Sequence, residues 1–252
     1  MKKVALLAAA AALFAATPAM AQSGGHLGLN FSNTETDSDD ADTIQGDIAF
    51  GGASGTIGYQ IDGGIGNTEA GSDDADHFTL AGHLFYNGGG WRVGGVVAHT
   101  AFDDTVSFDE TVYGIEGSFD LGASAVLTGS YTVGETEFFA DLDTWNLDAG
   151  IDFYASPNLR FGGTVGVGNL DAGAGSDVDT NTFGVDAEWQ PFTMPVSFRL
   201  AYDTFSVDDA FGDFDTLSVG VRWNWGGTLR ERDNATPFET RTAFYQRIYA
   251  VQ

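Results

Sequence analysis

The sequence predicts an all-β protein: an antiparallel up-and-down transmembrane β-barrel of about 12 strands. Three observations predict it. Apolar and polar residues alternate along twelve segments, tight turns and longer acidic segments alternate between them, and the N-terminus has the pattern of an export signal. Alternation with a period of two indicates a strand with one apolar and one polar face. Short turns at one end and long loops at the other are typical of transmembrane barrels.

The N-terminus predicts export. Lys2 and Lys3 precede an apolar run over 4–16 and the small-residue pattern Ala19-Met20-Ala21, which together predict a signal peptide over 1–21. The apolar run is too short for a membrane-spanning helix, which needs about 20 apolar residues. Because the chain has no cysteine, we expect neither a disulfide nor a lipoprotein anchor.

The alternating segments divide residues 22–227 into the strands of the expected barrel. The alternation is clear in eight segments: 27–31, 57–61, 78–86, 113–121, 145–153, 183–189, 196–202 and 217–225. It is weaker in four: 43–50, 91–100, 124–133 and 159–169. An even number of strands brings both ends of the barrel to the same side of the membrane, which we expect to be the periplasmic side.

The connections between the strands are of two kinds, which alternate along the chain. Five are predicted tight turns, at 51–55, 87–90, 121–124, 156–158 and 192–195. Six are predicted long acidic loops, at 33–42, 67–76, 103–110, 134–143, 171–179 and 207–215. We therefore expect short periplasmic turns and long acidic extracellular loops.

The charged residues test this layout. Of the 33 acidic residues in 22–227, 24 lie in the predicted loops, and the others are out of phase with the apolar residues of their own strand. A Lys or Arg facing lipid at the bilayer midplane costs about 2–4 kcal/mol, so this segregation suits a membrane barrel. A soluble β-sandwich with a buried apolar face also alternates. Aromatic residues at strand ends, such as Trp91 and Trp189, favour the membrane barrel, where they form interfacial girdles.

The end of the last predicted strand carries a recognisable motif. The chain reads Ser218-Val219-Gly220-Val221-Arg222-Trp223-Asn224-Trp225. This resembles the β-signal of bacterial outer-membrane barrels: a polar residue, glycine two positions later, and two large apolar residues in alternation. The resemblance implies recognition by the barrel-assembly machinery, with Ser218, Gly220, Trp223 and Trp225 as the insertion signal. Over 22–227 the chain resembles the porin-like outer-membrane β-barrels of Gram-negative bacteria.

The chain departs from this pattern by continuing past Trp225. Residues 228–252 carry Arg230, Arg232, Arg241 and Arg247, and we expect them to form a C-terminal periplasmic extension. Three arrangements fit the sequence. The extension is either a flexible tail, or it folds back against the acidic mouth or lumen of the barrel, or meets a periplasmic partner.

Charged residues on the polar faces are the candidates for lining a pore. The four arginines of the barrel fall near the predicted periplasmic ends of their strands, and several carboxylates fall at similar depth. The predicted pore-lining set is Arg92, Arg160, Arg199, Arg222, Asp47, Glu116, Asp120, Asp152, Asp186 and Glu188. Two interpretations remain open: a salt-bridge belt that stiffens the barrel, and a constriction whose charges set ion selectivity.

The charge balance restricts the function. With 36 acidic residues against 10 basic ones, the chain lacks the basic clusters that nucleic-acid binding requires. An acidic outer mouth attracts cations. We therefore expect an outer-membrane porin-like channel for ions or small hydrophilic solutes that prefers cations. The alternative is a non-conducting barrel with a structural or adhesive role.

We expect no enzyme activity, cofactor or dedicated metal site. The Asp76-His77 pair resembles part of the Asp/His constellation of omptin proteases, but no paired histidine motif or nucleophile motif accompanies it. The expected partners are outer-membrane lipid and lipopolysaccharide, the barrel-assembly machinery, and small ions or solutes. Divalent cations are further candidates at the acidic runs 38–42 and 72–76.

Overall fold

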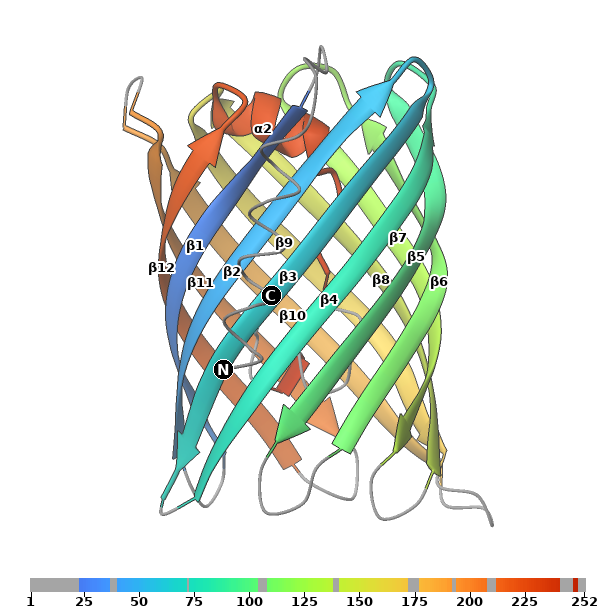
Figure 1. Ribbon diagram of the computed structural model, residues 1–252, viewed down its shortest axis with the longest axis vertical. Helices are drawn as coiled ribbons and strands as arrows, with labels where there is room; N and C mark the ends of the chain where they lie inside the picture. Colours follow the sequence, from blue (N-terminus) through green and yellow to red (C-terminus); the bar gives the residue numbers. More distant parts are fainter. Residues whose placement is uncertain are drawn as a thin grey trace.

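The computed structural model describes residues 23–36, 40–71, 73–103, 108–137, 141–171, 177–191, 194–207, 212–240 and 247–248. Within these ranges the chain forms one closed antiparallel barrel (Figure 1). Each strand pairs with its neighbours in sequence, and β1 pairs with β12 to close the wall. The strands are β1 (Ser23–Glu35), β2 (Asp40–Ser54), β3 (Ile57–Ala70), β4 (Asp73–Asn87), β5 (Trp91–Asp103), β6 (Phe108–Asp120), β7 (Ala125–Glu137), β8 (Asp141–Ser156), β9 (Leu159–Asp171), β10 (Asp177–Trp189), β11 (Val196–Val207) and β12 (Gly212–Trp225).

The barrel has its apolar face outside and its polar face inside. In β11, Phe198 and Leu200 are 49% and 52% exposed, whereas Ser197, Arg199 and Asp203 between and beyond them are buried. A soluble β-sandwich requires the opposite arrangement. The outward apolar residues therefore make a lipid-facing surface, and the predicted fold class is confirmed.

The two ends of the barrel differ. The predicted tight turns lie at one end, which we call the helix end because the helix α2 (Leu229–Ala235) lies there (Figure 1). At the opposite end, which we call the loop end, β1 ends at Glu35 and β2 begins at Asp40. The turn at 192–195 has residues 192–193 outside the described part of the chain.

The strands are longer at the loop end than the sequence predicts. Much of each acidic segment predicted as a loop is paired strand: Asp42 pairs with Glu69, and Glu69 with Asp74. Backbone pairing continues past the lipid-facing band because polar side chains there face water on both sides. Of the acidic runs 38–42 and 72–76, residues 38–39 and 72 lie outside the described residues.

Two glycines turn the chain from the wall into the lumen. After Trp225, Gly226 and Gly227 have φ of 101° and 105°, conformations that other residues adopt at a cost. Thr228 then caps α2: its side chain accepts a hydrogen bond from Glu231 N–H, and Glu231 accepts from the backbone N–H of Thr228. This capping box satisfies free donors of the first turn.

The described residues beyond α2 lie inside the barrel. Phe238 is buried against the inner wall, and Ile248 packs with Leu170, Phe205 and Val207 near the loop end. The contacts thus match the folded-back arrangement, and a flexible extension is wrong for these residues. Charge explains the difference, since arginines of the extension meet carboxylates of the wall. Within the described part of the chain, no helix has the length and apolarity to cross a membrane.

Candidate functional site

The interior of the helix end is built around a buried carboxylate, Glu188 of β10, which is 0% exposed. Arg232 of α2 donates to both of its oxygens, with N···O distances of 2.6 Å and 2.9 Å. Arg222 of β12 donates at 3.3 Å, and Ser197 donates a further hydrogen bond. Such two-pronged arginine–carboxylate contacts are among the strongest ion pairs in proteins. The helix is therefore held to the wall at its centre.

The electrostatic surroundings of α2 follow from these contacts. Burial alone lowers the pKa of Arg232, but the carboxylates of Asp233 and Glu188 outweigh it and raise the pKa above its ordinary value. Glu231 is exposed, and the hydrogen bonds from the backbone N–H and hydroxyl of Thr228 lower its pKa. Arg232 therefore stays charged in its buried position.

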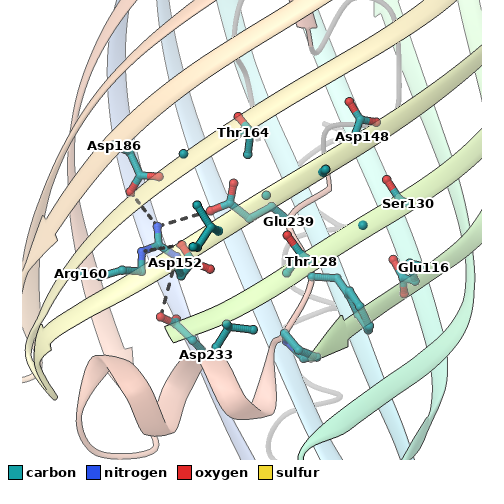
Figure 2. A pocket seen from close by; sticks show the side chains of 18 of the residues that line it. Glu116, Thr128, Ser130, Asp148, Asp152, Arg160, Thr164, Asp186, Asp233 and Glu239 are labelled. Carbon is teal, nitrogen blue, oxygen red and sulfur yellow. Dashed lines mark hydrogen bonds and ion pairs between the residues drawn. The ribbon is translucent and has the colours of Figure 1, made fainter. Parts of the chain in front are cut away.

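A second cluster surrounds Arg160 of β9 (Figure 2). Its guanidinium lies 2.9 Å from Asp186 and 3.4 Å from Glu239, and at longer range faces Asp152 and Asp233, at 3.7 Å and 3.8 Å. Asp186 also faces Arg199 at 3.6 Å. The cluster joins side chains of the wall to Asp233 and Glu239, which follow the barrel in sequence.

Smaller contacts complete the helix end. Asp120 accepts from Arg92 at 3.4 Å and from Arg230 at 3.1 Å. Asp47 lies 2.6 Å from His26 and 3.9 Å from Arg222. Every described arginine of the wall therefore faces at least one carboxylate.

His83 of β4 lies between two carboxylates. Its Nδ1 is 2.8 Å from Glu116, and its Nε2 is 3.0 Å from Asp62 and from Thr240. A ring nitrogen facing a carboxylate acts as a donor, so both nitrogens carry hydrogen. The Thr240–His83–Glu116 series has the residue types of a nucleophilic triad. A doubly protonated ring cannot serve as its general base.

Arginine and aromatic side chains of the C-terminal segment continue along the lumen. Arg247 donates to both oxygens of Asp148, each at 2.8 Å. Phe238 stacks on His83, with ring centroids 5.9 Å apart and an interplanar angle of 12°, and meets the edge of Phe85. The segment is held at several depths rather than only at its helix.

Glycines on the inner face make room for the carboxylates. A Cβ at Gly162 would meet Asp186, and one at Gly166 would meet Asp148. Each glycine is the cross-strand partner of that carboxylate. Small residues on this face therefore set where the charged side chains lie.

A cavity remains beside the segment, between it and the strands from β5 to β11. It leaves about 120 Å³ for the centres of water-sized molecules. Seven carboxylates and four arginines line it, together with hydroxyl groups such as Thr128, Ser130 and Thr164 (Figure 2). The charged groups of its lining therefore have an excess of negative charge.

The interior of the loop end is lined mostly by hydroxyl groups. Buried threonines pair across strands, Thr34 with Thr216 at 2.8 Å, Thr43 with Thr68 at 2.9 Å, and Thr79 with Thr100 at 3.1 Å. Other buried threonines of this half are Thr132, Thr136, Thr144 and Thr180. Charged side chains are thus concentrated at the helix end, and Glu110 is a buried carboxylate among the hydroxyl groups of the loop end.

The structure places all ten predicted pore-lining residues on the inner face. Glu188 and Arg160 are the centres of the two clusters described above, and four more lie around them: Arg199, Arg222, Asp152 and Asp186. The other four lie in the smaller contacts: Arg92, Asp47, Glu116 and Asp120. The predicted insertion signal lies on β12, where Trp225 pairs with Gly25 of β1.

Sequence analysis did not assign the partners that the C-terminal segment supplies. Arg230, Arg232, Asp233, Glu239 and Arg247 join the network, and Gln60, His83 and Asp148 receive the segment. One signal was present, because the excess of arginine after residue 227 contrasts with the acidic barrel. The individual pairs depend on how the segment enters the lumen, which alternation does not encode.

The histidines do not form a recognisable metal or catalytic group in the described residues. No cluster of three or more His, Asp or Glu side chains there has the arrangement of a metal site. His77 is buried, and its ring nitrogens have no hydrogen-bond partner within the described ranges. His99 is exposed, near Thr111, as the parity of its strand predicts.

Comparisons with known proteins identify the fold. No protein-family model matches the chain, and no curated protein matches it significantly. Among solved structures, the COG4313 outer membrane channel from Pseudomonas putida F1 has a TM-score of 0.63 at 13% identity, over 83% of this chain and 97% of that one.

Two further solved structures agree. The β domain of the Bordetella autotransporter Brka has a TM-score of 0.55 at 13% identity, over 81% of this chain and all 100% of that one. The KdgM porin, solved with disordered oligogalacturonate, has a TM-score of 0.53 at 8% identity, over 78% and 98%. Together with the closed wall and its apolar exterior, these similarities show that the chain has the fold of porin-like outer-membrane β-barrels of Gram-negative bacteria.

Proposed function

We propose that the protein is a narrow outer-membrane diffusion channel that prefers small cations. The observation that carries the proposal is the cavity beside the C-terminal segment, which is lined by seven carboxylates and four arginines. Rings of carboxylates favour cations in channels. The acidic strand ends at the loop end, where Asp42, Glu69 and Asp74 lie close in register, raise the local cation concentration further.

The width of the passage follows from the strand number and from what fills it. An eight-stranded barrel is just filled by side chains, and barrels of 16–18 strands hold a water channel. This barrel lies between, and its own segment occupies part of the lumen. The proposal is therefore restricted to ions and the smallest hydrophilic solutes.

The second candidate is a non-conducting barrel with a structural or adhesive role. The ion-pair network around Glu188 and Arg160 favours it, because this network fills the helix end with buried side chains. In this alternative, the network stiffens the barrel and the cavity is closed at one end.

Planar-bilayer recording in a salt gradient separates the two. A cation-preferring channel gives single-channel steps and a reversal potential of the sign for cation flow. Asp148→Asn with Asp152→Asn is expected to lower that potential, since both side chains line the cavity. Asp177→Asn is the matched control, because Asp177 is exposed on the outside of β10. Absence of steps from correctly folded protein contradicts the channel, and anion preference contradicts its selectivity.

The proposed partners follow from the surface. Outer-membrane lipid and lipopolysaccharide contact the apolar exterior, and divalent cations bridge lipopolysaccharide to acidic strand ends. The barrel-assembly machinery is proposed to recognise Ser218, Gly220, Trp223 and Trp225 on β12, the strand that closes the wall. Changing Gly220 and Trp223 together and following assembly into outer membranes tests this recognition.

A further inference from the structure

We propose that the lumen is a binding site for a peptide bearing an aromatic and an arginine side chain, and that the chain's own residues 236–240 and 247–248 occupy this site in cis. The site does not depend on ion conduction, since it rests on contacts between the wall and this segment. These contacts have three parts: a grip on the peptide backbone, an aromatic pocket and an arginine pocket.

Gln60 of β3 supplies the backbone grip. Its side-chain Nε2 donates to the carbonyl oxygen of Phe238 at 2.6 Å, and its Oε1 accepts from the N–H of the same residue at 3.2 Å. Gln60 is 1% exposed, and Asp62 accepts from its amide at 2.8 Å and 3.0 Å. Paired contacts to one residue's N–H and C=O imitate strand pairing, as in peptide recognition by β-augmentation. Asp62 fixes the orientation of the amide, so the grip is already formed.

His83 and Phe85 of β4 supply the aromatic pocket. The ring of Phe238 lies parallel to His83 and at 80° to Phe85, with centroids 5.9 Å and 5.3 Å away. Offset or edge-on aromatic contacts contribute about 0.5–1.5 kcal/mol beyond the burial itself. Two residues later, Thr240 reaches Nε2 of His83 and donates to Asp62. The same wall residues thus hold both the backbone and the side chains.

Asp148 of β8 supplies the arginine pocket. Both of its oxygens accept from Arg247 at 2.8 Å, and Thr182 contacts the same guanidinium at 3.3 Å. Arg247 is buried, and Gly166 opposite leaves space for the carboxylate. A planar, two-pronged contact selects arginine over lysine. The pocket therefore adds side-chain specificity nine positions after Phe238.

Attachment through α2 explains why the chain's own segment occupies the site. A short connection gives a tethered ligand a local concentration in the millimolar range. A separate peptide competes poorly with it. Substitutions in the segment that remove its contacts with the wall, without changing any wall residue, are expected to expose the site.

The test uses the full chain in detergent and a fluorescent peptide with the sequence of residues 236–248. The exposing variant, Phe238→Ala with Arg247→Ala, keeps every wall residue. We expect it to bind the peptide at least about tenfold more tightly than the unmodified chain, measured by fluorescence anisotropy. Adding Gln60→Ala and Asp148→Asn to the exposing variant is expected to abolish this gain. The matched control ligand is the same peptide with the changes Phe238→Ala and Arg247→Glu.

The outcomes are distinct. Failure of the folded exposing variant to bind the peptide overturns the proposal, and so does equal binding by the variant that also lacks Gln60 and Asp148. Folding is checked by the β-sheet circular dichroism signal. Should the double variant not fold, Arg247→Ala alone is tested with the same two criteria. Conductance is not measured in this experiment, so loss of the channel function leaves its result unchanged.

Discussion

The two halves of the lumen hold their polar groups in different ways. At the helix end, arginines and carboxylates form a dense network, with Glu188 bound by Arg232, Arg222 and Ser197. At the loop end, neutral threonines pair across strands, as Thr43 does with Thr68. Both arrangements pair polar groups that face inward, but only the first involves the C-terminal segment through charge.

This difference indicates in which half of the lumen the stability of the barrel depends on individual polar partners. A buried charge that loses its partner is costly, because desolvation is no longer offset. A hydroxyl pair replaced on both sides by groups of similar shape is nearly neutral. Stability is therefore expected to be sensitive to single changes at the helix end and tolerant of them at the loop end.

Glu188→Ala is expected to have the largest effect. It leaves the guanidinium groups of Arg232 and Arg222 without their shared carboxylate, and breaking a buried pair costs about 3–5 kcal/mol. The loss of unfolding free energy is measured by denaturation with guanidinium chloride in detergent, followed by tryptophan fluorescence. A cost below that of a single threonine change at the loop end would contradict the comparison.

Gly166→Ala is expected to have an intermediate effect. The added Cβ meets the carboxylate of Asp148, displaces it from Arg247 and costs about 1–3 kcal/mol as an overpacked site. Gly163→Ala is the matched control, because its Cβ has no neighbour nearer than 3.9 Å. Equal unfolding midpoints for the two variants would show that Asp148 adjusts without loss.

Thr43→Val is expected to cost about 1 kcal/mol, because it leaves the hydroxyl of Thr68 without this cross-strand partner. Thr43→Val with Thr68→Val is expected to recover most of that loss. The same unfolding measurement compares the single and double variants. A double variant worse than the sum of the singles would mean that the threonine pairs act as a network.

The smallest expected effect is the pH dependence of α2. The folded-state pKa of Glu231 is lowered by its hydrogen bonds to Thr228, so the contribution of the ionised form is present above the unfolded-state pKa. It is lost as the pH falls through the folded-state pKa. Unfolding midpoints compared at neutral and acidic pH, for the unmodified chain and for Glu231→Gln, measure it. An identical pH dependence in the two would exclude this carboxylate as the cause.

The sequence predicted the wall far better than the contents of the lumen. Alternation assigns each side chain of a strand to one face, so the inward position of Arg160 or Glu188 follows from its neighbours. The same alternation misplaced strand ends, because paired strands continue through Asp42 and Glu69 where lipid no longer requires apolar residues. The partners of Arg232 and Arg247 were out of reach, since they depend on the turn at Gly226 and Gly227.

The turn at Gly226 and Gly227 connects β12, which closes the barrel against β1, to the C-terminal segment inside the lumen. Because α2 follows directly from β12 and packs on β1, where a Cβ on Gly24 would lie 3.0 Å from that of Ala235, the helix buttresses the junction between the first and last strands. Separation of β1 from β12 would therefore also disrupt the packing of the helix on β1. The helix thus stabilises the barrel from the inside at the junction of β1 and β12, the neighbouring strands that are most distant in sequence.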